Sequence, residues 1–202
     1  AGRRGLPAET RAYVAKIAPE LNGTGDVGAI AAPTAGLHFD QALLDAVLAA
    51  GAQVAAVTLW VGLGTFQPVA SDRLSAHTMH AERYAIEGSV ASRVRETRER
   101  GGRVVAVGTT VARALEDASR DTGHAEAGDR VTRLMIRPGF PWRCVDALFT
   151  NFHVPRSTLL ALVASFGGYN AVMAAYRHAV DAGYRFYSYG DAMFLPRRHA
   201  ED

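Results

Sequence analysis

The stretch VVAVGTTVARALE, residues 104–116, indicates how this chain folds. Its valine-rich start is typical of a buried strand, and Gly108 followed by two threonines marks a turn. Thr110 fits the N-cap of a helix that we expect to run to residue 123. A buried strand that turns directly into a helix is the repeating unit of α/β proteins, so the stretch predicts that class.

The same alternation of strands and helices extends along the chain in both directions. Asp40 is expected to cap a helix that Gly51 ends. The expected strands are 27–33, 52–61, 103–110, 130–139 and 145–155, and the expected helices are 40–51, 89–102, 110–123, 156–168 and 169–183. This order predicts an α/β fold with a largely parallel sheet and flanking helices. We expect an N-terminal extension or linker at 1–26, the α/β domain at 27–196 and a tail at 197–202.

The composition limits the classes of protein that fit. The 202 residues are 49% hydrophobic and 21% charged, which is ordinary for a globular protein. The formal net charge of +2 does not by itself indicate a strongly charged partner. Cys144 is the single cysteine, which excludes an internal disulfide and fits a reducing cytoplasm. No apolar run approaches the roughly 18–20 residues of a membrane span.

The segment HTMHAE places His77, His80 and Glu82 within residues 77–82. Imidazole and carboxylate groups are metal ligands, but the H-x-x-H-x-E spacing differs from the H-E-x-x-H of a zinc helix. A pair of acid/base groups and two exposed loop histidines are the alternatives. The expected loop at 62–82 is longer than an ordinary connection, and loops of this length are often functional.

Polar turns follow several expected strands, where ligands bind in α/β sheets. The turns are PTAGLHF (33–39), GLGTF (62–66), GTT (108–110) and TNFH (150–153). Taken singly, each is explained by a tight turn or a helix cap, and Arg113 fits an exposed i,i+3 pair with Glu116. Their joint placement favours a binding site instead. It predicts that His38, His80, Thr109 and His153 share one pocket.

Several motifs together resemble the S-adenosylmethionine:tRNA ribosyltransferase-isomerases of queuosine biosynthesis, the QueA family. The likeness runs in order over residues 27–196, and the long motif ending in TNFHVPRSTLL is highly specific. Two departures stand out: Trp60 occupies a position where the family usually has His, and the chain is expected to lack the family's N-terminal segment and inserted β-barrel. The motifs are AAPTAGLHF (31–39), VTLWVGLGTFQPV (57–69), HTMHAE (77–82), VVAVGTTVARALE (104–116), RPGFPWRCVDALFTNFHVPRSTLLALVASFGG (137–168) and YRFYSYGDAMFL (184–195).

The resemblance implies a cytoplasmic enzyme that transfers and isomerises the ribosyl moiety of S-adenosylmethionine. The implied acceptor is 7-aminomethyl-7-deazaguanine in tRNA, and the products are epoxyqueuosine in tRNA, adenine and methionine. Such a reaction needs a general base, a proton donor toward adenine and exclusion of water. It implies S-adenosylmethionine as co-substrate, with no prosthetic group, no metal and no membrane partner.

The resemblance also assigns candidate site residues. His80, Glu82 and His77 are the expected catalytic residues, and His80 leads because a free imidazole titrates near about 6.5. The expected contacts to S-adenosylmethionine or the acceptor are Thr34, Gly36, His38, Phe39, Gly62, Gly64, Thr65, Gly108, Thr109, Thr110, Arg113, Asn151, His153, Tyr189 and Asp191. Three alternatives stay open: a relative acting on a free small-molecule acceptor, a non-catalytic module that binds S-adenosylmethionine or RNA, and a metal hydrolase.

Overall fold

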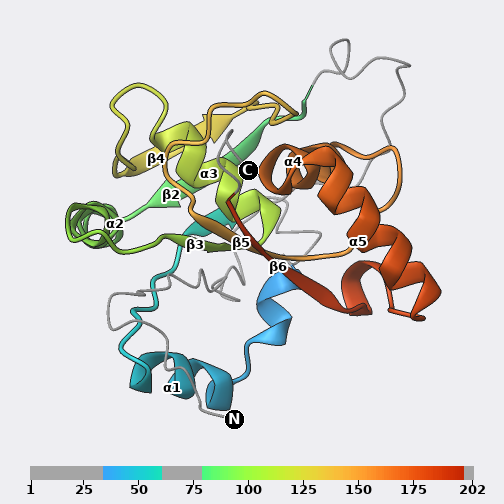
Figure 1. The fold of residues 1–202 in the computed structure, drawn as a ribbon. Coiled ribbons are helices and arrows are strands. Elements are labelled where there is room, and N and C mark those ends of the chain that lie inside the picture. The colour runs from blue at the N-terminus through green and yellow to red at the C-terminus, as the bar shows by residue number, and fades with distance from the viewer. Residues whose placement is uncertain (1–33, 61–78, 198–202) are drawn as a thin grey trace, which may run out of the picture.

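The computed structural model describes residues 34–60 and 79–197 (Figure 1). The expected strand at 27–33, the turn at 62–66 and the extension at 1–26 lie outside these residues. The elements in chain order are η1 (Thr34–His38), α1 (Gln41–Ala49), β1 (Thr58–Trp60), β2 (Glu82–Ile86), α2 (Gly88–Glu99), β3 (Val105–Val107), α3 (Thr109–Ala118), β4 (Gly128–Thr132), β5 (Ala147–Asn151), α4 (Thr158–Gly167), α5 (Tyr169–Asp181), η4 (Tyr187–Tyr189) and β6 (Ala192–Pro196). The predicted α/β class is confirmed.

The described strands form two three-stranded sheets, ordered β1-β2-β4 and β3-β5-β6. Only β3 and β5 pair in parallel, while the other three pairings are antiparallel. The prediction of a largely parallel sheet is therefore wrong for these strands. A parallel pair needs a long crossover, which α3 and β4 supply between β3 and β5. Two helices separate β5 from β6 instead, and they bring the chain back so that β6 starts beside the end of β5.

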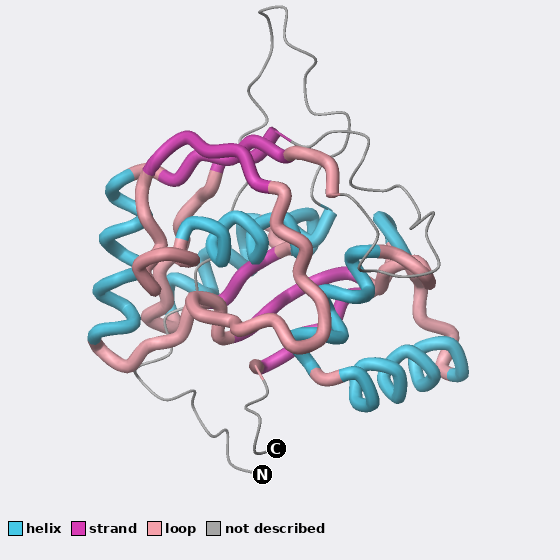
Figure 2. The backbone as a smooth tube through the Cα atoms, turned by 90° about the horizontal axis from the view of Figure 1, so that it is seen from above, coloured by secondary structure: helices cyan, strands magenta, loops and turns pink. Residues whose placement is uncertain are grey.

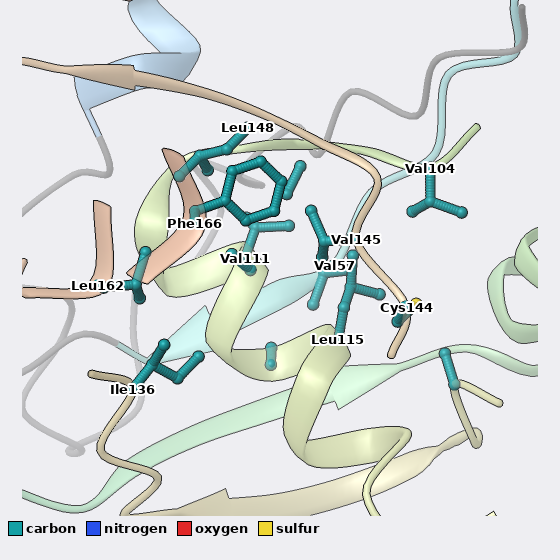
Figure 3. Close-up of a cluster of buried hydrophobic side chains, with 14 of the residues drawn as sticks. Val57, Val104, Val111, Leu115, Ile136, Cys144, Val145, Leu148, Leu162 and Phe166 are labelled. Atoms are coloured by element: carbon teal, nitrogen blue, oxygen red, sulfur yellow. The ribbon is translucent and has the colours of Figure 1, made fainter. Parts of the chain in front are cut away.

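Helix α3 lies at the centre of the hydrophobic core. Nine of its ten residues are buried, and its valine and leucine side chains meet residues from both sheets and from α4. Figure 3 shows this cluster, and Figure 2 shows the backbone of the helices and strands from a second direction. The labelled residues are Val57, Val104, Val111, Leu115, Ile136, Cys144, Val145, Leu148, Leu162 and Phe166.

The predicted helix at 40–51 is confirmed as α1, with the expected ends. The Leu43 backbone N–H donates to Asp40 Oδ1 at 2.8 Å, and Gly51 adopts a positive φ of 84°. The helix nevertheless buries none of its residues. Figure 1 shows α1 set apart from the two sheets. Leu44 packs, partly buried, against Ala35 and Val107, so this apolar helix borders the described core without entering it.

Strand β2 is an element that the sequence reading missed. Its residues alternate between buried and more exposed positions, with Glu82, Tyr84 and Ile86 facing inward. This period of two is the ordinary signal of a half-buried strand. We had placed Glu82 at the end of a loop, so the strand that positions this carboxylate was not anticipated.

Helices α4 and α5 meet at a corner formed by two glycines. Gly168 has a φ of 79° and lies between the two helices, which bend by 115°. A Cβ at Gly167 would lie 2.9 Å from Val172 Cγ2 and 3.1 Å from Leu195 Cδ2. In the described part of the chain no single helix is long and apolar enough to cross a membrane, and this bent pair passes that test only by length and composition.

Candidate active site

The turns GTT and TNFH lie side by side, as expected from the sequence. β3 and β5 run in parallel, so their carboxyl ends reach the same edge of the sheet. The Gly108 backbone N–H donates to the Phe149 carbonyl at 2.8 Å, and Gly108 has a φ of 97° that an L side chain adopts only with strain. Glycine here lets the chain turn from β3 directly into α3, whose first residues Thr109 and Thr110 are buried.

Asn151, at the end of β5, joins the turn at residues 34–38 to this edge. Thr34 Oγ1 donates to Asn151 Oδ1 at 3.3 Å, and Asn151 Nδ2 lies 3.0 Å from His38 Nε2. Because an amide NH₂ only donates, His38 Nε2 accepts in this arrangement and the ring proton is on Nδ1. Asn151 is only 3% exposed, so this network is fixed in a sheltered position.

Aromatic contacts hold the same turn against β5. The rings of His38 and Phe39 both meet Phe149 edge-on, with centroid distances of 5.6 Å and 5.0 Å. Edge-to-face packing of this kind contributes beyond simple area burial. Phe149 was not among the predicted site residues, although it precedes Thr150 and Asn151 in the strand.

His153 is a neutral imidazole at neutral pH. Its Nε2 lies 2.8 Å from Thr150 Oγ1, and its backbone N–H donates to the Tyr176 hydroxyl at 2.8 Å. Burial lowers the pKa of His153 from 6.5 to about 4. The residue is therefore suited to hydrogen bonding with an uncharged group.

Asp191 directly precedes β6, whose first residue Ala192 pairs with Asn151. Its carboxylate accepts from the Arg185 backbone N–H at 2.8 Å and from the Arg185 guanidinium at 3.3 Å. The Arg185 backbone N–H and guanidinium lower the pKa of Asp191. Arg185 was also missed, because no sequence spacing predicts that the chain doubles back over six residues.

Arg113 makes a buried ion pair that the sequence reading did not anticipate. Its Nη1 lies 2.8 Å from Glu82 Oε2, and the two side chains are 3% and 5% exposed. The guanidinium Nε also donates to the Leu134 carbonyl at 3.2 Å, while Nη2 is buried without a hydrogen-bond partner among the described residues. The expected exposed pair with Glu116 is wrong, because α3 is buried on nearly every side.

Glu116 instead anchors the segment that leads into β5. Its carboxylate accepts backbone N–H groups from Arg143, Cys144 and Val145 at 2.8–2.9 Å. Burial raises the pKa of Glu116, and the three backbone donors oppose this rise. The two charged residues of the core face of α3 thus serve different parts of the site: Arg113 holds β2, and Glu116 holds the entry to β5.

The HTMHAE segment is described only in part. His80 is exposed and lies two residues before Glu82, which begins β2. His77, Gly62, Gly64 and Thr65 lie outside the described residues, as does the side chain of Tyr189.

The pocket that the sequence predicts for His38, His80, Thr109 and His153 stays a prediction, although some candidate site residues do lie together. Thr34, His38, Asn151 and Asp191 meet at one edge, beside His153. Of the remaining predicted contacts, Gly36 lies in the same turn as His38. Among the described side chains no three His, Cys, Asp or Glu residues group as metal ligands.

The two sheets, the central helix and the polar edge at the ends of β3 and β5 define an α/β protein with a candidate ligand site at the carboxyl ends of parallel strands. The family model described as "Queuosine biosynthesis protein" matches residues 24–195. This match covers most of the chain, which therefore belongs to that family.

Two relatives of this chain carry the same name. The chain is 61% identical over 171 residues to the S-adenosylmethionine:tRNA ribosyltransferase-isomerase of Cupriavidus metallidurans, covering 85% of this chain and 48% of that protein. For the protein of that name from Herminiimonas arsenicoxydans the identity is 56% over 170 residues, covering 84% and 50%. The chain thus spans about half the length of these relatives.

A solved structure confirms the fold. The crystal structure of S-adenosylmethionine tRNA ribosyltransferase from Thermotoga maritima is 47% identical and superimposes with a TM-score of 0.66, covering 80% of this chain and 51% of that one. The observed arrangement of sheets and helices is therefore the arrangement of this family.

Proposed function

We propose that this chain carries the active site of an S-adenosylmethionine:tRNA ribosyltransferase-isomerase. The enzyme transfers and isomerises the ribosyl moiety of S-adenosylmethionine onto 7-aminomethyl-7-deazaguanine in tRNA. It yields epoxyqueuosine and releases adenine and methionine. The observation that carries the proposal is the Thr34–Asn151–His38 network, built from two separate family motifs at the carboxyl end of β5.

The chemistry follows from the sulfonium of the donor. A positive sulfur makes the adjacent ribose C–H acidic, so a base removes that proton and elimination opens the sugar and releases adenine. The acceptor amine then attacks, and closure to the epoxide expels methionine. These steps require acid/base groups and a sheltered site, and every bond change takes place on the substrates.

The polar groups at the edge fit different parts of such a substrate. His38 and Asn151 supply hydrogen bonds in a sheltered place, and neutral His153 supplies another without adding charge. Gly108, Thr109 and Thr110 begin α3, where backbone N–H groups favour a carboxylate such as that of the methionine moiety. Asp191, with Tyr189, is assigned to the acceptor base.

His80 is our candidate for proton transfer, and Glu82 anchors the start of β2 two residues after it. The Glu82 carboxylate is already held by Arg113 at 2.8 Å, which favours this anchoring role over binding the acceptor's ammonium group. His77 completes the proposed group. Replacing His80 with Ala should lower turnover by about 100-fold or more. His124→Ala, at an exposed histidine on another loop, is the matched control and should keep full activity.

One incubation tests the function against its alternatives. The protein is mixed with S-adenosylmethionine and tRNA bearing 7-aminomethyl-7-deazaguanine, and adenine is followed by chromatography. Adenine release that depends on this tRNA supports the proposal. Release with the free 7-aminomethyl-7-deazaguanine base but not with tRNA would favour the small-molecule relative, and S-adenosylmethionine binding with no adenine release would favour a binding module.

The same preparation tests the metal hydrolase. A stoichiometric metal found by elemental analysis, with activity lost on chelation, would support a centre that includes His77 and His80. We expect full adenine release after extensive chelation, because the proposed acid/base chemistry uses organic groups alone.

A further inference from the structure

Two non-glycine residues in the described part of the chain have a left-handed backbone, and both flank the end of β5. Arg156 has a φ of 58° and Tyr187 a φ of 68°. Arg156 lies in the turn after β5, and Tyr187 lies in η4, the turn before β6. Such backbone costs free energy and persists only where the surroundings impose it, which is common at binding sites.

The surroundings of Tyr187 impose its conformation through several contacts. The Tyr187 N–H donates to the Phe152 carbonyl at 3.0 Å, and the Gly190 N–H donates to the Tyr187 carbonyl at 3.1 Å. A Cβ on Gly190 would collide with the Arg185 carbonyl oxygen, so only glycine lets the turn close. The Asp191 carboxylate fixes the other end through the Arg185 N–H at 2.8 Å.

This rigid turn leaves the Tyr187 side chain in solvent. The residue is 52% exposed, and its ring centroid lies 6.3 Å from that of Phe186. A tyrosine that served to fill the core would be buried, and a turn that needed only the backbone shape would be served by glycine or asparagine. The strained conformation is therefore explained by the position that it gives to the ring.

That position is beside the candidate site. The turn η4 packs against η1, which carries His38. The adjacent strand begins with Ala192 paired to Asn151. An exposed phenol ring held at this edge presents a flat face to whatever occupies the site.

We propose that Tyr187 is a stacking platform for a purine-like ring of the substrate. This inference rests on the proposed function, which brings two such rings to the site: the adenine of S-adenosylmethionine and the 7-deazaguanine of the tRNA. Stacking on an aromatic side chain suits either ring, because it requires only a π-face. The hydroxyl is not needed for this role.

The test removes the Tyr187 ring and relieves the strain in the backbone at that residue. Tyr187→Gly suits the left-handed conformation, so the midpoint of thermal unfolding should stay within about 3 °C of the unchanged protein. Binding should nevertheless weaken by about 10-fold, whereas Tyr187→Phe should bind within about twofold of the unchanged protein. Tyr169→Ala, at a 63% exposed tyrosine at the start of α5, is the matched control and should change neither quantity.

Two binding arms identify the ring that stacks. One arm measures S-adenosylhomocysteine by calorimetry, and the other measures tRNA bearing 7-aminomethyl-7-deazaguanine by gel shift at fixed salt. Weakening in either arm supports the platform and assigns its ligand. The stacking proposal is wrong if Tyr187→Gly binds both probes as tightly as the unchanged protein. It is also wrong if Tyr187→Phe loses as much binding affinity as Tyr187→Gly.

The outcome is separable from that of the proposed function. Adenine release by the unchanged protein tests the reaction, and the two binding arms do not depend on turnover. An active protein with unaltered Tyr187→Gly binding would retain the function and overturn the platform. If Tyr187→Gly should unfold, Tyr187→Asn removes the ring with a residue that tolerates the same backbone, and the same binding criteria apply to it.

Discussion

Helices α1 and α3 show that apolar composition and burial are different properties. α1, with the sequence QALLDAVLA, contains one charged residue and buries none of its residues. α3, with the sequence TTVARALEDA, contains an arginine and two acids and buries nine of its ten residues. The difference lies in contacts: the Arg113 and Glu116 charges of α3 are met by an ion pair and backbone groups, whereas Leu44 of α1 is only partly buried against Ala35 and Val107. Leu43 and Leu48 are exposed in the described chain.

The largest effect should come from breaking the buried pair of α3. Arg113→Met leaves the Glu82 carboxylate without its cation in a site where both side chains are at most 5% exposed. Loss of one partner of a buried pair costs about 3–5 kcal/mol, so the free energy of unfolding in urea should fall by that amount.

A surface pair next to the same helix is the control for Arg113. Arg120 lies 3.8 Å from Asp117 and its side chain is 61% exposed, so Arg120→Met should cost less than about 1 kcal/mol. Adding Glu82→Leu to Arg113→Met should recover part of the loss. Equal losses of unfolding free energy for Arg113→Met and Arg120→Met would contradict the expected difference between a buried and an exposed ion pair.

Buried and exposed histidines should also differ in how they affect stability as the pH changes. Burial lowers the pKa of His153 from 6.5 to about 4, so the unfolded chain binds more protons than the folded protein between these values. Stability is therefore full above about pH 6.5 and declines by about 2–3 kcal/mol as the pH falls to about 4. His153→Gln should flatten this part of the curve.

The measurement is the urea midpoint of unfolding, determined at intervals of half a pH unit. Exposed His124, changed to Gln, should leave the slope between pH 4 and 6.5 as it is in the unchanged protein. A slope that persists in His153→Gln would mean that other groups account for the acid sensitivity.

The N-cap of α1 offers a smaller and local effect. Asp40→Ala removes the acceptor for the Leu43 N–H, which is worth about 1 kcal/mol to a helix. Because α1 buries none of its residues, amide exchange across 41–49 should quicken roughly fivefold while the urea midpoint barely moves. A midpoint that fell together with the exchange protection would show that α1 unfolds as one unit with the core.

The smallest effect is expected at the exposed face of α1. Leu48 is 51% exposed, so Leu48→Gln should change stability by less than about 0.5 kcal/mol. Leu115→Ala on α3, at 3% exposure, should cost about 2–5 kcal/mol in the same urea assay. A loss of 2 kcal/mol or more for Leu48→Gln would show that the protein covers the exposed face of α1. The two helices would then no longer differ in burial.

The fold could be predicted from the sequence where the signals are local. Asp40 and Gly51 mark the ends of α1 as expected, because capping and positive φ depend on neighbouring residues alone. The expected N-cap Thr110 is wrong, because α3 begins at Thr109 and its N-cap is Gly108. Strand direction was not predictable in this way. Whether β6 meets β5 parallel or antiparallel depends on how two helices pack, which no short stretch encodes.

The candidate site was predictable to a similar extent. The glycines, hydroxyls and imidazoles that follow β3 and β5 were expected at one edge, and Asn151 does join His38 there. The partners of charged groups were not expected: Arg113 finds Glu82 thirty-one positions away, and Asp191 is held by Arg185. Such pairs arise when strands align, so spacing along the chain cannot reveal them.

The two-glycine corner between α4 and α5 ties a distant bend to the proposed chemistry. A Cβ at Gly167 would require the Val172 and Leu195 methyl groups to shift, and Leu195 belongs to β6. β6 in turn begins beside Asp191. A single methyl group added at residue 167 would therefore displace the Leu195 side chain, on a strand whose opposite end lies beside the candidate site.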